Sequence, residues 1–191
     1  ILQEDGSRIT SFEYKSHSIF DGKPKLKGLP ATYVEDPTEA STLEIILHDE
    51  VIDAELHLYY TVYHDRNVLT RSVKIVNNGS QKLNITRIMS ASVDFFDSDF
   101  EMVHLSGAWA RERHVKVRKL ETGIQSISST RGTSSPQQNP FIALKRPETN
   151  EHSGEVYGFN FVYSGNFLAQ VEVDYYDVTR VTMGINPFDF N

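Results

Sequence analysis

The acidic run Asp94-Phe-Phe-Asp97-Ser-Asp99-Phe-Glu101 is the densest group of chemically active side chains in the sequence. Its oxygens could bind calcium, but the run lacks the glycine and the distal glutamate of an EF-hand loop. Two carboxylates about 5–5.5 Å apart could instead act as the nucleophile and the acid/base of a retaining glycosidase. No spacing in the sequence selects such a pair. We therefore expect a strand end and a turn with solvated carboxylates.

The seven histidines form no metal-binding pattern. There is no His-x-His pair and no His-Glu-x-x-His motif, and His57 and His64 would point to opposite faces of one continuous strand. The sequence also lacks a Gly-x-Ser-x-Gly elbow and a phosphate-binding glycine loop. We expect no metal, no cofactor and no catalytic residue in this chain.

The segment Gly107-Ala-Trp109-Ala-Arg111-Glu112-Arg113 holds the only tryptophan. Trp109 could stack on a sugar ring, and Arg111 or Arg113 could bind a hydroxyl or a carboxylate. Tryptophan and arginine are also the residues that dominate protein–protein interfaces, and we favour that interpretation. We predict a contact set at an interface or at the rim of a pocket: Trp109, Arg111, Glu112, Arg131, Asn139, Pro140 and Phe141.

Strands must position these residues, because almost every periodic stretch repeats at every second residue. In residues 55–63, Leu56, Leu58, Tyr60 and Val62 would form an inward apolar face. Residues 156–163 carry four aromatic rings on one face and are predicted to form a central strand, with a turn at 164–166 and a returning hairpin strand over 167–173.

Further strands are predicted with uncertain ends, and Asn77-Asn78-Gly79-Ser80 is predicted to close a hairpin. The strand ranges are roughly 8–20, 42–48, 68–76, 84–96, 101–105, 109–119, 124–129, 141–145, 167–174 and 179–184. About eleven or twelve strands without a long helix predict an all-β fold. We expect a large two-sheet antiparallel β-sandwich with few or no helices.

The 191 residues suit a single domain over 1–191. A net charge of -7 argues against nucleic acid as a partner, and the apolar runs are shorter than the roughly 20 residues of a membrane span. The absence of cysteine suits a cytoplasmic chain. Because the chain opens at Ile1 without a methionine and stops at Asn191 after an ordered-looking segment, we expect a fragment of a longer protein.

Several stretches resemble the amino-terminal β-domain of the family 36 glycoside hydrolases, the large bacterial-type α-galactosidases. They run in family order: Tyr14-Lys-Ser-His17, Lys23-Pro-Lys25, Gly28-Leu-Pro-Ala-Thr-Tyr33, Leu105-Ser-Gly-Ala-Trp109-Ala-Arg-Glu-Arg113, Ser129-Thr-Arg-Gly-Thr-Ser-Ser135, Asn139-Pro-Phe141, Gly154-Glu-Val-Tyr-Gly158, Tyr163-Ser-Gly-Asn-Phe167 and Gly184-Ile-Asn-Pro-Phe-Asp-Phe190. Pro136 stands where the family usually has a histidine, so no polar role is carried over to that position.

The resemblance implies a galactose-mutarotase-like β-supersandwich followed, after residue 191, by a catalytic (β/α)8 barrel. In the family, two aspartates of that barrel hydrolyse terminal α-galactosides with retention of configuration. The implied parent is a cytoplasmic bacterial enzyme, commonly a tetramer. In it this chain would pack on the barrel, shape the active-site rim and help oligomer assembly, while galactosides bind through the parent.

By itself the chain is expected to be inactive, and separation from the barrel should expose an apolar patch on it. Two alternatives remain open. The chain could be a stand-alone carbohydrate-binding module that uses Trp109, Tyr59 and Tyr63. It could also be a mutarotase-like sugar-active domain, which would need a placed histidine and carboxylate pair.

Overall fold

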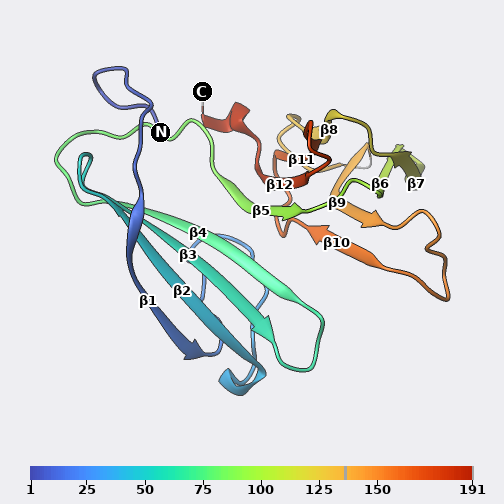
Figure 1. Cartoon of the computed structure of the whole chain (residues 1–191), viewed down its shortest axis with the longest axis horizontal. Helices are drawn as coiled ribbons and strands as arrows, with labels where there is room; N and C mark the ends of the chain where they lie inside the picture. The colour runs from blue at the N-terminus through green and yellow to red at the C-terminus, as the bar shows by residue number, and fades with distance from the viewer. Residues whose placement is uncertain (136, 191) are drawn as a thin grey trace. The chain divides into compact units, whose positions relative to one another are not determined.

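The computed structural model describes residues 1–135 and 137–190, so Pro136 lies outside the described residues (Figure 1). It contains twelve strands: β1 (Glu13–Asp21), β2 (Ala40–Asp49), β3 (Ala54–Tyr63), β4 (Leu69–Asn77), β5 (Met89–Phe95), β6 (Glu101–Ala108), β7 (Arg111–Lys119), β8 (Gly123–Ser129), β9 (Gln138–Lys145), β10 (Val156–Asn160), β11 (Phe167–Val173) and β12 (Thr179–Ile185). Two short 3-10 helices, η1 (Pro37–Glu39) and η2 (Pro187–Phe190), complete the described elements. No helix in these ranges has the length and apolar content to cross a bilayer. The predicted all-β fold is confirmed.

The strands form three four-stranded antiparallel sheets, whereas the sequence predicted two. The chain divides into two compact units, Ile1–Ser90 and Ala91–Asn191. The first unit contains one sheet with the order β1-β2-β3-β4. The second contains the sheets β10-β9-β6-β7 and β5-β12-β11-β8. The observed number of sheets exceeds the predicted number because the first unit forms a sheet of its own beside the two sheets of the second unit. The single domain over 1–191 stays a prediction.

In the first unit, consecutive strands pair as a simple meander (Figure 1). The buried carboxylate of Asp49 holds the turn between β2 and β3, since it accepts hydrogen bonds from the backbone N–H groups of Ser11, Val51 and Ile52 at 2.6, 3.0 and 3.3 Å. Burial of Asp49 favours the protonated form, but these donors outweigh it and lower the pKa of the carboxyl.

The face of β3 predicted to point into a core is largely uncovered within its own unit. Leu56 and Leu58 are only half-buried and Val62 is 52% exposed, while Thr61 and Tyr63 on the other face are buried. The segment between β1 and β2 covers that other face, where the Tyr63 hydroxyl donates to the carbonyl of Tyr33 at 3.1 Å. The alternation of residues correctly separated the two faces of β3. The loop between β1 and β2, however, covers the face that was predicted to be exposed.

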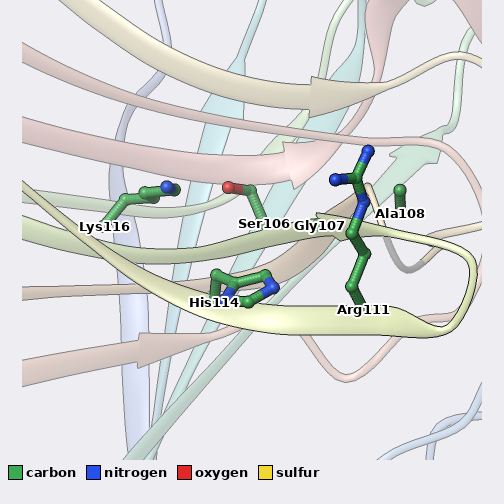
Figure 2. A pocket seen from close by; sticks show the side chains of 6 residues that line it. All are labelled: Ser106, Gly107, Ala108, Arg111, His114 and Lys116. Atoms are coloured by element: carbon green, nitrogen blue, oxygen red, sulfur yellow. The ribbon is translucent and has the colours of Figure 1, made fainter.

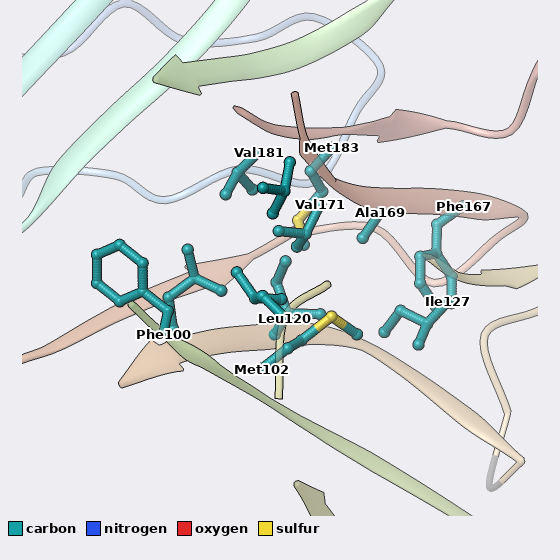
Figure 3. Close-up of a cluster of buried hydrophobic side chains, with 12 residues drawn as sticks. Phe100, Met102, Leu120, Ile127, Phe167, Ala169, Val171, Val181 and Met183 are labelled. Carbon is teal, nitrogen blue, oxygen red and sulfur yellow. The ribbon is translucent and has the colours of Figure 1, made fainter. Parts of the chain in front are cut away.

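The second unit has a continuous hydrophobic core between its two sheets (Figure 3). Every second residue of β11 is buried, from Phe167 to Val173, which confirms the period-two pattern there. Strand β9 packs against β8 and β11, so the two sheets share this core. The core residues are Phe100, Met102, Leu120, Ile127, Ile142, Leu144, Phe167, Ala169, Val171, Val173, Val181 and Met183.

Two predicted hairpins are wrong. Strand β10 pairs only with β9 and is therefore an edge strand rather than a central one, and β11 pairs with β8 and β12 in the other sheet. Residues 164–166 thus connect two sheets. Likewise, β4 pairs only with β3, so Asn77-Asn78-Gly79-Ser80 closes no hairpin. Turn-forming residues show where the chain bends, but the partner of the next strand depends on contacts distant in sequence.

Candidate interface at the β6–β7 hairpin

The predicted contact segment forms a tight antiparallel hairpin between β6 and β7, closed by Trp109 and Ala110. Its register is irregular between Ser106 and Ala108. Ala110 and Arg113 adopt positive φ angles of 60° and 57°. Such conformations cost non-glycine residues of order 1–3 kcal/mol and recur at functional sites. The hairpin therefore has a specific, strained geometry.

Two residues explain how this geometry is held. Gly107 faces the opposite strand so closely that a Cβ atom would lie 2.2 Å from the carbonyl oxygen of Arg111. Only glycine fits there. The Glu112 carboxylate accepts a hydrogen bond from the backbone N–H of Ala110 at 2.9 Å, which stabilises the turn. Glu112, predicted as a contact residue, thus also has a local structural role.

Trp109 lies at the tip of the hairpin with its side chain 86% exposed. A large aromatic ring in water is unfavourable unless a partner covers it. Because the turn beneath Trp109 is fixed, the backbone would lose little conformational freedom on binding. This is the arrangement expected of an interface anchor.

A first hollow of about 350 Å³ lies beside the hairpin and contains Arg111 (Figure 2). Arg111 and Lys116 extend on the same side of the hairpin, with Ser106 between them (Figure 2). None of the ion pairs in the described ranges involves Arg111 or Lys116. Two cations and a hydroxyl suit a carboxylate-bearing partner. The hollow is lined by Ser106, Gly107, Ala108, Arg111, His114 and Lys116.

A second hollow of about 290 Å³ brings together three more of the predicted residues. Since Leu105 and Ser106 are adjacent in β6, alternation places this hollow on the opposite face of the sheet. The side-chain carbonyl of Asn139 is buried and has no hydrogen-bond partner among the described protein atoms. The lining residues are Leu105, Arg113, Asn139, Pro140, Phe141 and Asn160.

Arg131 lies elsewhere. It follows β8 in an exposed loop, where its backbone N–H lies 3.4 Å from the Ser129 hydroxyl, and it lines neither hollow. The structure therefore distributes the predicted set over the hairpin tip, two hollows and a separate loop. The prediction omitted His114 and Lys116. The alternation of basic residues with valines along β7 could have indicated them, because it places the charges on one face.

The acidic run is engaged in ion pairs instead of being simply solvated. Asp94 binds Arg180 through two hydrogen bonds of 2.7 Å, and Asp97 binds Arg146 at 2.5 and 3.1 Å. These arginines lower the pKa of both carboxyls. A glycosidase acid requires a raised pKa, so these two carboxylates do not behave as a catalytic acid/base pair.

A histidine with two carboxylates does occur on the first unit's sheet. The His57 Nδ1 lies 2.8 Å from Glu44 and its Nε2 lies 3.3 Å from Glu55, which also binds Lys15 at 2.5 Å. Both ring nitrogens are therefore already engaged, which leaves neither to act on a sugar. No group of three or more potential ligands that could hold a metal was found among the described residues.

The tyrosines proposed for a carbohydrate-binding module are also occupied. Tyr63 is buried, and Tyr59 is half-buried. Burial of Tyr59 and its hydrogen bond to Glu44 raise the pKa of the phenol to about 12. Neither ring offers an open stacking platform.

Comparison with known proteins gives a consistent result. Residues 1–191 match the Glycosyl hydrolase family 36 N-terminal domain. The chain is 57% identical over 187 residues to α-galactosidase AgaA of Geobacillus stearothermophilus, which covers 98% of this chain and 26% of the relative. It is 48% identical to α-galactosidase 1 of Pediococcus pentosaceus, over 100% of this chain and 26% of the relative. The crystal structure of the Geobacillus enzyme superposes with a TM-score of 0.96 at 56% identity, over 98% of this chain and 26% of that one. The chain thus spans about a quarter of the length of these relatives.

Proposed function

Because the chain belongs to the glycosyl hydrolase family 36 N-terminal domain family, we propose that it is the non-catalytic amino-terminal β-domain of a retaining α-galactosidase. The observation that carries the proposal is the match over all 191 residues to relatives about four times as long. The engagement of Asp94, Asp97 and His57 in internal pairs supports a non-catalytic role. The chemistry then belongs to a catalytic barrel outside this chain, acting on terminal α-galactosides.

Within that enzyme, the β6–β7 hairpin supports the barrel and the rim of the active site. Trp109 serves as the anchor, since it is exposed on a fixed turn. Arg111 and Lys116 receive acidic groups in the first hollow, and Asn139 receives a donor in the second. The same surface is available for contacts between subunits of a homotetramer. A cytoplasmic location fits a chain without cysteine.

Hydrolysis of an aryl α-galactoside tests the proposal. The 191-residue chain and the longer product of the same gene are assayed side by side, at equal molar concentration. We expect activity in the longer protein alone. Activity in the 191-residue chain would overturn the non-catalytic role, and inactivity of the longer protein on α-galactosides would overturn the enzyme class.

Calorimetric titration of the 191-residue chain with galactose separates the proposal from a stand-alone binding module. We expect no saturable heat, because Tyr59 and Tyr63 are covered within their own unit. Saturable binding that is abolished by Trp109→Ala would instead support the module.

A further inference from the structure

The first unit carries an apolar sheet face that the rest of that unit leaves largely uncovered. Cross-strand partners define it, because paired residues of an antiparallel sheet share one face. Ile19 pairs with Leu43, Ile45 with Leu58, and Val62 with Leu69. We call it the open apolar face; its members are Ile19, Leu43, Ile45, Leu47, Leu56, Leu58, Tyr60, Val62, Leu69, Val73 and Ile75.

None of these side chains is fully buried. Ile19 is 72% exposed and Leu69 is 58% exposed, while the residues nearer the middle of the sheet are half-buried by their strand neighbours. The hydrophobic cluster between Phe100 and Met183 belongs to the second unit, and on this face only the end at Ala54, which pairs with Asp49, is buried. A sheet of this kind gains its stability by burying one apolar face, and here its own unit supplies no covering layer for that face.

The opposite face of the same sheet is satisfied from within the unit. The segment before β2 covers one end, where the Thr42 hydroxyl donates to the carbonyl of Gly22 at 2.6 Å. The rest carries the network of His57, Glu44 and Glu55. The loop thus covers one end of the polar face, and polar side chains satisfy one another on the rest of it. The apolar face is the one that still needs burial.

The composition of the open apolar face indicates what covers it. Within the described ranges, its ionisable groups other than Tyr60 lie at the edges and ends of the sheet. Arg71 on β4 lies 5.1 Å from the Tyr60 ring centroid, the Tyr14–His17 pair lies on the β1 edge, and Asp21 and Asp49 lie at the ends of β1 and β2. A contact surface so poor in charge resembles a domain core cut in half, which is typical of permanent interfaces. The relatives have about three quarters of their length outside the matched region, so a covering layer in the same polypeptide is available.

We infer that the open apolar face is a permanent docking surface for the part of the α-galactosidase polypeptide that lies outside this chain. This docking role rests on the proposed function, because docking needs the longer polypeptide of such an enzyme. The docking role also goes beyond the proposed function, since the main apolar contact is assigned to the first unit's sheet and not to the β6–β7 hairpin. The hairpin then adds polar and aromatic contacts at a different place on the chain.

Thiol labelling of the longer protein tests this inference. The chain has no cysteine, so each substitution here introduces the only labelling site within these 191 residues. Ile19→Cys and Leu69→Cys report on the open apolar face. Ser18→Cys is the matched control, since Ser18 is also exposed but lies on the opposite face, 3.3 Å from Glu44. Alkylation rates of the labelled peptide are measured by mass spectrometry in the native protein and in denaturant, and each native rate is divided by its denatured rate.

We expect the normalised rates at positions 19 and 69 to be at least about tenfold lower than at position 18, because alkylation there first requires the interface to open. Equal rates at all three positions in an active enzyme would overturn the inference and leave the proposed function intact. Equal protection at position 18 would also overturn it, since docking would not select the apolar face.

Two further outcomes separate the possible occupants and the two proposals. Protection of positions 19 and 69 that increases with protein concentration would identify a second copy as the occupant and overturn the assignment to the same polypeptide. Protection in a protein that fails to hydrolyse α-galactosides would support the docking surface while the proposed function fails.

Discussion

Arg146→Ala should destabilise the second unit, because this residue joins three kinds of contact at one edge of the sandwich. Its guanidinium binds the Asp97 carboxylate at 2.5 and 3.1 Å and donates to the carbonyl of Asp99 at 3.1 Å. It also lies 3.9 Å from the centroid of the Phe100 ring, which belongs to the hydrophobic core. The alanine variant loses all of these contacts together.

The magnitude follows from how exposed each contact is. The arginine is 22% exposed and Asp97 is 47% exposed, so the ion pair is partly screened by solvent and contributes about 1 kcal/mol. The contact with Phe100 contributes about 1 kcal/mol, and the hydrogen bond to the carbonyl contributes about 0.5–1 kcal/mol. We expect the free energy of unfolding to fall by about 2–3 kcal/mol, equivalent to roughly 5–10 °C in Tm for a chain of this size.

Urea unfolding followed by circular dichroism measures the loss. Trp109 fluorescence would be a poor signal, since the indole is already exposed in the folded state. Arg180→Ala is the matched control. Arg180 also binds a carboxylate through two hydrogen bonds, from Nε and Nη2 to Asp94, but its own side chain is more exposed than that of Arg146, and no ring contact of Arg180 is present in the described structure.

The control variant should therefore lose less than half as much stability as Arg146→Ala. Equal losses in the two variants would refute the reasoning, because they would show that the ion pair alone, and not the contact with the core, determines the effect. An unchanged midpoint in Arg146→Ala would refute it as well.

Three other predictions concern the β6–β7 region. Gly107→Ala should lower the free energy of unfolding by about 2 kcal/mol or more, since the new Cβ would lie 2.2 Å from a backbone oxygen. Gly158→Ala should be tolerated, because its Cβ would meet the nearest atom at 3.8 Å, and chemical denaturation compares the two variants. Burial and the nearby charges of Arg118 and Lys116 lower the pKa of His104, so the unfolded chain binds a proton at this residue more readily than the folded chain. The contribution of neutral His104 to stability should be fully present above about pH 6.5 and should decline as the pH falls towards the lowered pKa. His104→Gln should remove this pH dependence in a series of thermal melts. Trp109→Ala should leave the unfolding free energy of the chain within about 0.5 kcal/mol, because the ring packs on nothing in its own unit, while assembly or activity of the longer enzyme decreases in sedimentation and kinetic assays; unchanged assembly and activity would remove Trp109 from the interface.

Much of the local structure was predictable because a strand imposes a period of two on its own side chains. Strand β3 was expected at 55–63 and lies at 54–63, and β11 was expected from residue 167 and begins there. Each of these features depends on residues close together in sequence. The exact turn of the hairpin that presents Trp109 was not predicted, since residue 109 was expected to begin a strand, whereas β6 extends to Ala108 and β7 begins at Arg111.

The sequence by itself thus determined an all-β chain, the approximate strand positions and the two faces of each strand. Only the tertiary structure decided which strands are neighbours, and hence that β10 is an edge strand and that β11 belongs to another sheet. It also placed Phe141 and Asn160 beside Arg113, and turned the polar face of β3 towards the covering loop. The physical reason is that alternation reports which side chains share a face, while pairing and coverage depend on contacts between segments far apart in the chain.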